Sequence, residues 1–351
     1  MIVNLKLAIF VFNHSSISSH KNSFDDNITV KRTQKPKPMI CKNSVWIFLF
    51  LINSLSIFSQ SREVAFLTTS AEYSATAANS SSDLPGDLVY VPFDLTDGKI
   101  FVNARLEGEQ KSFMLDTGAP GLVLNTSQTP ENIEKNADGV TGGLYLQTVT
   151  VKTFEWAGMR TDDTDAVAVN ISHLEKAAGR NLAGLIGYDV LKNTEVLFDY
   201  EKNLLLLSAN RRSAWHRDRT PKAVFDFEMY DHLPVLKVKI GGETVRLGLD
   251  CGAEINLLDA SFLKKLPRPL LSNKKKEILT GVNQAEILSV ASTVSLTEIG
   301  KEKFADMRYL FTDLSDLKNE DGKKLDGLLG FPFFESAVIS INYKKQKLYV
   351  W

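Results

Sequence analysis

The sequence predicts a mostly β protein made of two similar lobes that are related by pseudo-twofold symmetry. Two observations carry this prediction. Two blocks of sequence recur in the same order without gaps, and each block reads as short strands joined by Gly turns. A chain of 351 residues is long enough for two lobes that each bury a core. We therefore expect each half of the chain to fold as one lobe.

The first recurring block surrounds an aspartate in each half. Leu106–Asn125 reads LEGEQKSFMLDTGAPGLVLN, and Ile240–Asp259 reads IGGETVRLGLDCGAEINLLD. Asp116 and Asp250 are 134 positions apart (250 minus 116), and the same offset relates the Gly-Glu turn before them and the glycine after them. The correspondence continues upstream of both blocks, where VPFDLTDGKIFVNARL aligns with FDFEMYDHLPVLKVKI. This repetition indicates a tandem duplication.

The second recurring block lies near the end of each half. Leu182–Leu207 reads LAGLIGYDVLKNTEVLFDYEKNLLLL and aligns without a gap with Leu325–Val350, LDGLLGFPFFESAVISINYKKQKLYV. We expect one lobe over residues 88–208 and the other over residues 222–351. The polar and basic residues 209–221 between them are interpreted as a solvated linker.

Both halves carry the patterns of β hairpins. FVNARLEG and VLKVKIGG alternate apolar and polar residues before a Gly turn, and the strands SFMLD and RLGLD then end at the aspartate. VLFDY…NLLLL and AVISINY…KLYV are expected to be hairpins as well. Three short helices are expected, at Ile171–Ala178, Gly187–Leu191 and Ala260–Leu266. Trp156, Trp215 and the run Phe331-Pro332-Phe333-Phe334 are interpreted as core or interlobe packing.

The amino-terminal region has the pattern of a targeting segment. Val45–Phe58 is an apolar run that follows Lys42, precedes small residues, and is shorter than the roughly 20 residues of a membrane span. We interpret residues 1–61 as an over-extended amino terminus, with translation starting at Met39, plus a secretory signal peptide. Residues 62–87 are interpreted as a flexible segment, and the mature protein as exported to a periplasm. An uncleaved membrane anchor is the alternative.

Composition excludes several classes of function. A net charge of -1, from 41 Lys and Arg against 42 Asp and Glu, gives no general attraction to nucleic acid or to anionic lipid. Two cysteines and five scattered histidines match no zinc-site spacing, no HExxH helix and no GxSxG motif. We expect no metal, no cofactor, no nucleic-acid partner, no membrane span in the mature form, and a monomer.

The two strand-end aspartates point to acid–base chemistry. Burying one carboxylate costs several kcal/mol unless the carboxylate is paired or hydrogen-bonded. Two carboxylates at equivalent positions of a duplicated unit are expected to meet across the pseudo-twofold axis. Carboxyls about 3 Å apart share one proton, so one can take a proton from water while the other polarises a carbonyl. Loop aspartates that only cap turns are the alternative.

Together these residues resemble the retropepsin-like aspartic proteases of the pepsin clan. LDTGA and LDCGA each follow an apolar strand, and each half later carries an apolar-apolar-Gly element, Leu185-Ile186-Gly187 and Leu328-Leu329-Gly330. Gly-containing segments stand where the flaps of that family fall, with Gly142 26 residues after Asp116 and Gly281 31 residues after Asp250. The resemblance covers residues 88–351. It implies two retropepsin-like β-barrel lobes in a pepsin-like bilobal architecture and an extended peptide or protein as substrate.

The resemblance also implies a set of site residues. Asp116 and Asp250 would be catalytic, and Thr117, Gly118, Cys251 and Gly252 would support their loops. Gly142, Gly143, Tyr145 and Gly281 would lie on the flaps and face the substrate, although a plain hairpin tyrosine is an equal interpretation of Tyr145. Asn256 is a further candidate for a hydrogen bond near the second loop.

Cys251 departs from the family pattern. The family has Thr or Ser there, and that hydroxyl forms a hydrogen bond between the two loops. A thiol is a weak donor and acceptor, so we expect Thr117 to make the better half of this contact. The leading function is an aspartic endopeptidase. The alternatives are a peptide- or protein-binding module that has lost turnover and a surface or assembly protein without cleft chemistry. A buried inert thiol is favoured over a redox sensor for Cys251.

Overall fold

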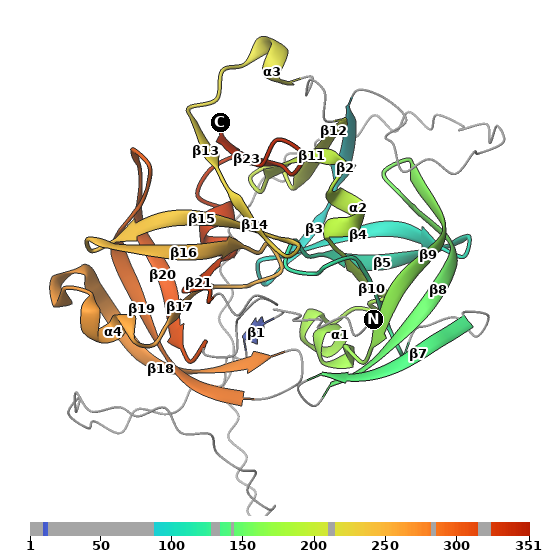
Figure 1. Ribbon diagram of the computed structural model, residues 1–351, viewed down its shortest axis with the longest axis horizontal. Helices are drawn as coiled ribbons and strands as arrows, with labels where there is room; N and C mark the ends of the chain where they lie inside the picture. Colours follow the sequence, from blue (N-terminus) through green and yellow to red (C-terminus); the bar gives the residue numbers. More distant parts are fainter. Residues whose placement is uncertain are drawn as a thin grey trace, which may run out of the picture. The chain divides into compact units, whose positions relative to one another are not determined.

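The computed structural model describes residues 10–12, 88–127, 134–141, 144–209, 215–281, 286–314 and 324–351. All of them belong to one compact unit, Met1–Arg32 with Ser80–Trp351. The second unit, Thr33–Asn79, lies outside the described residues together with the apolar run Val45–Phe58. Figure 1 shows the first lobe in cyan to green and the second lobe in yellow to red.

The first lobe consists mainly of strands. They are β2 (Val89–Pro92), β3 (Asp94–Thr96), β4 (Lys99–Leu106), β5 (Glu109–Leu115), β6 (Leu122–Asn125), β7 (Glu134–Thr141), β8 (Leu144–Trp156), β9 (Met159–Val169), β10 (Gly184–Ile186), β11 (Thr194–Asp199) and β12 (Leu204–Ala209). Two short helices, α1 (Ser172–Ala178) and α2 (Tyr188–Leu191), precede β10 and β11. The helices expected at Ile171–Ala178 and Gly187–Leu191 are therefore confirmed.

The second lobe repeats this order of elements. Its strands are β13 (Ala223–Asp226), β14 (Glu228–Tyr230), β15 (Leu233–Ile240), β16 (Glu243–Leu249), β17 (Asn256–Asp259), β18 (Leu271–Gly281), β19 (Glu286–Ile299), β20 (Glu302–Thr312), β21 (Gly327–Leu329), β22 (Ile339–Asn342) and β23 (Lys347–Val350). Helix α4 (Phe262–Lys265), the 3-10 helix η1 (Arg268–Leu270) and α5 (Phe331–Phe334) complete it. Helix α4 confirms the third expected helix.

The repeat in the sequence is also a repeat in the structure. Strands β2 to β6 and β13 to β17 begin and end at positions that differ by 134. From β9 and β20 onward the offset is 143, because the second lobe has nine more residues between the end of β17 and the end of β19 (299 minus 259) than the first lobe has between the end of β6 and the end of β8 (156 minus 125). Equal strand limits follow from the equal spacing of Gly turns and apolar residues, since strands end where those turns begin.

Each lobe closes into a six-stranded barrel. In the first lobe β4 pairs with β5 on one side and with β8 on the other, which closes the order β4-β5-β10-β6-β9-β8. In the second lobe β15 pairs with β16 and with β19, which closes β15-β16-β21-β17-β20-β19. Closure leaves no unpaired edge within the ring. The expected mostly β fold with two barrel lobes is confirmed.

A third sheet joins the two lobes. Its order is β13-β23-β22-β11-β12-β2, so three strands come from each half of the chain. The central strands β11 and β22 pair antiparallel, and Leu197 lies opposite Ser340. These two residues are equivalent in the repeat, because they differ by the offset of 143. The pseudo-twofold axis therefore passes through this pair.

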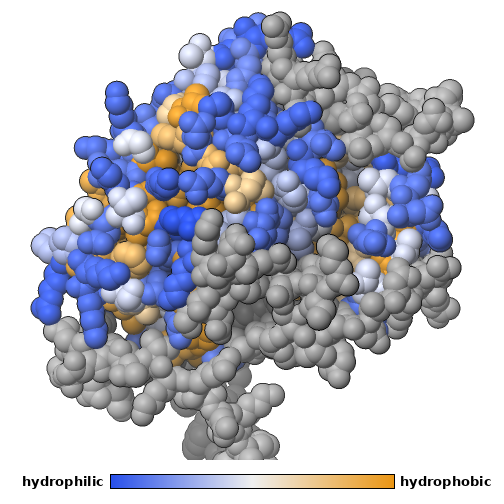
Figure 2. Space-filling view, viewed as in Figure 1, coloured by the Kyte–Doolittle hydropathy of each residue, from blue (hydrophilic) through white to orange (hydrophobic). Residues whose placement is uncertain are grey.

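Apolar side chains fill the barrels and the space between the lobes. Phe113 packs edge-on against Phe154 inside the first lobe, with 5.5 Å between ring centroids. Phe198 packs against Phe334 of the other lobe at 5.1 Å. Trp156 is buried, as are Phe333 and Phe334, so their packing role is confirmed. The described surface in Figure 2 is mostly hydrophilic, with smaller areas of hydrophobic residues between the polar ones.

The segment between the lobes is less solvated than we expected. It contains the short helix α3 (Trp215–Asp218), and Trp215 is only 6% exposed. The Trp215 indole N–H donates to Glu195 of β11 at 3.2 Å, and His216 Nε2 lies 2.8 Å from the same carboxylate. The packing role expected for Trp215 is therefore confirmed, whereas the expectation of a solvated linker is wrong for His216, since its ring nitrogen bonds to a carboxylate inside the interlobe sheet.

The amino-terminal residues that are described form one further strand. Strand β1 (Phe10–Phe12) pairs antiparallel with β18, with Phe10 opposite Gly281. Within the described residues, no helix is both long and apolar enough to cross a membrane.

Candidate active site

Two equivalent loops present the aspartates. Asp116 follows β5 and Asp250 follows β16. Their backbone N–H groups donate to Ile186 O at 2.9 Å and to Leu329 O at 3.0 Å. The apolar-apolar-Gly elements therefore lie directly beside the aspartate loops, as the resemblance implied.

Glycines make this close approach possible. A Cβ at Gly184 would lie 1.9 Å from Val123 O, and one at Gly327 would lie 2.0 Å from Leu257 O. A Cβ at Gly187 would lie 2.4 Å from Ala119 O, and one at Gly330 would lie 2.5 Å from Ala253 O. No side chain fits at such distances, so the loops can pack against the strands only where glycine stands.

The two carboxyls face each other across the lobe boundary. Gly118 N donates to Asp116 Oδ1 at 2.8 Å, and Gly252 N donates to Asp250 Oδ1 at 2.9 Å. A Cβ at Gly118 would lie 2.6 Å from Asp250 Oδ2, and a Cβ at Gly252 would lie 2.6 Å from Asp116 Cγ. Each carboxyl thus occupies the space that the glycine of the opposite loop leaves open. Both aspartates are fully buried.

Burial governs the protonation of this pair. It raises the pKa of Asp116 to about 6, although hydrogen bonds from the Asp250 side chain and from the N–H groups of Gly118 and Ala119 oppose the rise. Burial also raises the pKa of Asp250 well above its ordinary range, and the negative charge of Asp116 adds to that effect. The pair therefore holds one proton over a wide range of pH, with the other carboxyl ionised.

Thr117 and Cys251 cross between the loops in a reciprocal arrangement. Thr117 Oγ1 donates to Leu249 O at 3.0 Å and accepts from Cys251 N at 2.9 Å. Cys251 Sγ accepts from Thr117 N at 3.4 Å and donates to Leu115 O at 3.5 Å. The thiol takes the position of a second hydroxyl, with longer and weaker bonds. Burial also raises the pKa of the Cys251 thiol, so the sulfur stays protonated and inert.

The expected flap residues are placed only in part. Gly142 and Gly143 lie outside the described residues, between β7 and β8. Tyr145 lies on β8, where its backbone pairs with Val140, but its side chain is outside the described set. Gly281 ends β18. Two hairpins therefore stand at the expected positions, β7–β8 and β18–β19, while the groups at their tips are left as predictions.

Asn256 lies beside the second loop, as the sequence suggested. Its Oδ1 accepts from Gly330 N at 2.8 Å, and its Nδ2 donates to Arg308 O at 3.1 Å. It therefore ties the start of β17 to the residue that precedes α5 and to β20.

Two contacts between the lobes were not expected from the sequence. In the turn between β14 and β15, His232 Nε2 lies 2.8 Å from Gly118 O of the first aspartate loop. At the start of β4, Lys99 Nζ donates to Glu254 Oε2 of the second loop at 2.8 Å, and the lysine side chain is 5% exposed. Single histidines and lysines carry no pattern in the sequence. The alignment of the two halves places His232 at the position equivalent to Gly98. This difference between the halves was the signal that the sequence offered.

Two buried tyrosines were also missed. Burial raises the pKa of both Tyr200 and Tyr343 well above the ordinary value, and charges at the aspartate loops contribute to both shifts. The two residues are related by the offset of 143, so the aligned YEKN and YKKQ turns contained the signal. They pack around the loops through aromatic contacts, Tyr200 with Phe331 at 5.5 Å and Tyr343 with Tyr188 at 5.3 Å.

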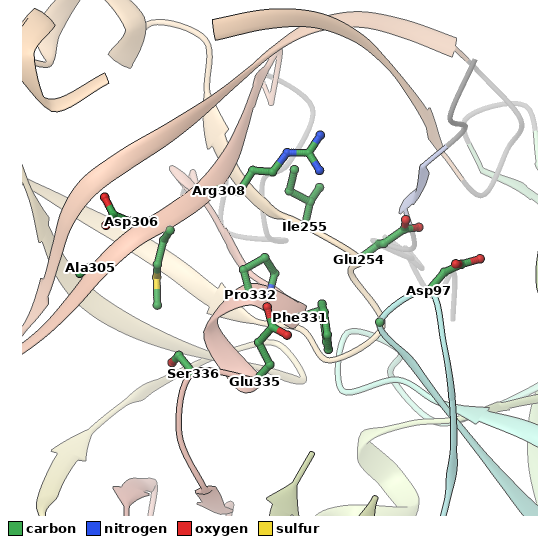
Figure 3. Close-up of a pocket in the computed structure, with 12 residues that line it drawn as sticks. Asp97, Glu254, Ile255, Ala305, Asp306, Arg308, Phe331, Pro332, Glu335 and Ser336 are labelled. Carbon is green, nitrogen blue, oxygen red and sulfur yellow. The ribbon is translucent and has the colours of Figure 1, made fainter. Parts of the chain in front are cut away.

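A cavity of about 530 Å³ lies beside the second aspartate loop. Figure 3 shows Phe331 and Pro332 of α5 next to Glu254 and Ile255, with Asp97 of the first lobe close to Glu254. Neither Asp116 nor Asp250 lines this cavity. It is therefore separate from the carboxyl pair, although it adjoins the loop that carries Asp250.

Comparisons with known proteins agree with this geometry. The family model described as retroviral aspartyl protease matches residues 98–198, and the model described as aspartyl protease matches residues 236–333. The two matches fall on separate halves of the chain and together cover more than half of its 351 residues. None of the curated proteins compared with the chain matches it significantly. The duplicated barrels, the paired aspartate loops and these matches show that the chain belongs to the retropepsin-like aspartic protease family.

Proposed function

We propose that the protein is an aspartic endopeptidase that hydrolyses peptide bonds through the Asp116–Asp250 pair. The single observation that carries this proposal is the fully buried, face-to-face arrangement of the two carboxyls on equivalent loops. In the singly protonated pair, the ionised carboxylate would take a proton from a water molecule. The protonated carboxyl would polarise the scissile carbonyl. Neither step requires a covalent intermediate on the protein.

An extended peptide is the substrate that the fold favours. The outer edge of β18 accepts β1 as an antiparallel partner, so it is able to pair with a peptide backbone. We propose that translation starts at Met39, so that residues 1–38 are not made, and that the signal peptide after Met39 is removed during export to the periplasm. The mature protein would then leave this edge free for a substrate. The edge of a flap strand forms hydrogen bonds with the backbone of a peptide and not with its side chains. We therefore propose unfolded or extended protein segments as substrates.

Activity of the purified mature protein tests this function. Protein beginning at about Arg62 is expected to cleave a denatured protein or a peptide library, and a transition-state-like peptide inhibitor is expected to compete. Asp116→Asn and Asp250→Asn are each expected to abolish cleavage, because a neutral amide cannot cycle the shared proton. Cleavage that survives both substitutions would belong to a contaminant and would contradict the proposal.

A non-catalytic peptide-binding module is the second candidate. Cys251 favours it, because the thiol holds the loops through bonds of 3.4 and 3.5 Å where Thr117 makes bonds of 3.0 and 2.9 Å. Such a module would bind extended peptides with measurable affinity in a titration but would leave them intact at every pH. A surface or assembly protein, the third class, would show neither cleavage nor peptide binding.

We also propose lobe limits of 88–208 and 222–351, a signal peptide within residues 1–61, a flexible segment over 62–87, and a monomeric mature protein. Amino-terminal sequencing of natively expressed protein tests the processing site. A mature chain that starts at Met1 or Met39 and stays in the cytoplasm would contradict the proposed export. Light scattering of the purified mature chain tests the monomer.

A further inference from the structure

The two aspartate loops are held from the opposite lobe by different chemistry. His232 of the second lobe contacts Gly118 O at 2.8 Å. The position equivalent to His232 is Gly98, 134 residues earlier, which has no side chain to offer to the second loop. The first lobe instead sends Lys99 to the Glu254 carboxylate. Among the residues that the structure describes, a side chain therefore bonds to the carbonyl of Gly118 in the Asp116 loop but not to that of Gly252 in the Asp250 loop.

The acceptor fixes the tautomer of His232. A carbonyl oxygen can only accept, so Nε2 must carry the hydrogen in this contact. Burial lowers the pKa of His232, while the bond to Gly118 O and the carboxylates of Asp231, on its own turn, and Asp189, on α2, oppose the shift. The imidazole is therefore neutral at neutral pH and acts as a fixed N–H donor.

This donor acts on the peptide that solvates Asp116. The carbonyl of Gly118 and the N–H of Ala119 belong to one peptide group. That N–H donates to the backbone oxygen of Asp116 at 3.1 Å, and its closeness to the Asp116 carboxyl lowers the pKa of that carboxyl. Hydrogen bonds in a chain polarise one another, so donation to the carbonyl makes the N–H a stronger donor. A stronger donor favours the ionised form of the carboxyl. The N–H of Ala253 likewise lowers the pKa of Asp250, but the position equivalent to His232 is Gly98, so no equivalent histidine donates to the carbonyl of the Gly252–Ala253 peptide.

We propose that His232 is a positioning residue that acts through the Gly118–Ala119 peptide and makes Asp116, rather than Asp250, the ionised member of the pair. This inference rests on the proposed function and deepens it. It assigns the role of base toward water to Asp116 and the role of proton donor toward the carbonyl to Asp250. The duplicated site is then chemically asymmetric, although its backbone is symmetric.

Carbon-13 NMR of aspartate side chains tests the inference without any need for cleavage. The two carboxyls are assigned with Asp116→Asn and Asp250→Asn, and their titrations are followed in the mature protein. In the wild type, Asp116 is expected to ionise first. His232→Leu removes the donor and is expected to raise the pH at which the pair first ionises by about 0.5. His232→Gln, whose amide nitrogen can occupy the position of Nε2, is expected to restore it.

Lys99→Met is the matched control, because it breaks the other contact between a lobe and an aspartate loop without touching Gly118. In Lys99→Met, the pH at which the carboxyl pair first ionises is expected to stay closer to the wild-type value than in His232→Leu. Equal shifts in both variants would show that His232 only holds the lobes together and would overturn the inference. So would an unchanged titration in His232→Leu, or a wild type in which Asp250 ionises first.

Two further measurements keep the result decisive. If His232→Leu does not fold, His232→Asn serves in its place, since it is polar but too short to reach Gly118 O, and the same upward shift is expected. If cleavage is found, the acidic limb of the kcat/KM profile is expected to move with the NMR titration. A protein that cleaves nothing but shows the expected titrations would contradict the endopeptidase and leave the inference about His232 intact.

Discussion

The loop after Asp116 and the loop after Asp250 have the same backbone hydrogen bonds but different side-chain contacts. In both loops the aspartate N–H donates to an apolar residue of the neighbouring short strand, and the second following N–H donates to the carboxyl. Thr117 and Cys251 differ, as do His232 and Lys99, the residues that reach in from the opposite lobe. The backbone frame that brings the carboxyls together is therefore the same in both lobes, while the side chains that tune it are free to differ.

Substituting the glycine of either loop is expected to have the largest effect. Gly118→Ala would place a methyl carbon 2.6 Å from Asp250 Oδ2, and Gly252→Ala would place one 2.6 Å from Asp116 Cγ. The carboxyls must then move apart, and we expect cleavage to fall by about 100-fold or more in both variants. Gly108→Ala is the control. Its φ of +79° costs stability, but no atom lies near the added carbon, so activity is retained. A much larger loss of cleavage in one of these two variants than in the other would show that the two loops are not equivalent.

The pH dependence of stability distinguishes the buried carboxyls from ordinary ones. Folding raises the pKa of Asp116 from 3.8 to about 6, so the folded chain binds this proton more tightly than the unfolded chain. The stabilisation is complete below about pH 4 and is lost as the pH rises through about 6, a change of about 3 kcal/mol. Urea unfolding of wild type and Asp116→Asn from pH 4 to pH 8 measures it. The variant is expected to show a flatter profile, and parallel profiles would contradict the burial of an ionisable pair.

Removing each crossing side chain sharpens the contrast between Thr117 and Cys251. Thr117→Ala leaves Leu249 O and Cys251 N without their hydroxyl partner and is expected to cost about 2 kcal/mol. Cys251→Ala removes only two weak sulfur bonds and is expected to cost clearly less. Chemical denaturation of both variants at one pH gives the comparison. Equal losses would show that the thiol carries as much of the contact as the hydroxyl.

Cys251→Thr is expected to have the smallest effect. A second hydroxyl would restore shorter bonds to Leu115 O and Thr117 N, worth about 1 kcal/mol, and would make the two loops alike. We expect a slightly higher melting temperature and activity that is unchanged or raised. Complete loss of cleavage with an intact circular dichroism spectrum would contradict this account, because it would assign a chemical role to the thiol.

The parts of the fold that the sequence predicted are those that depend on local spacing. Gly turns, alternating apolar residues and the strand-end aspartates are short-range patterns that recur at a constant offset. The strands and the aspartate loops of the two halves can therefore be aligned from the amino-acid sequence alone. The glycines of the two apolar-apolar-Gly elements were predictable for the same reason, since each leaves room for a neighbouring carbonyl.

The contacts that were missed depend on residues far apart in the chain. Lys99 and Glu254 are separated by 155 positions, and His232 and Gly118 by 114. Trp215 was expected to pack, but the carboxylate that receives its N–H, Glu195, belongs to a strand of the interlobe sheet. No single-residue pattern identifies such partners, because only the packing of the two lobes against each other brings them together. The offset between repeats was the one signal that placed His232 and Gly98 at equivalent positions.

The pairing of Leu197 with Ser340 at the centre of the interlobe sheet bears on how such a chain arises. A strand that lies antiparallel to its own equivalent has a self-complementary edge. A single ancestral lobe with that edge would assemble as a twofold homodimer, with one aspartate loop from each copy. Duplication and fusion of its gene would then preserve this antiparallel pairing of equivalent strands between the two lobes. Once fused, the two copies could diverge independently, which an obligate homodimer cannot do.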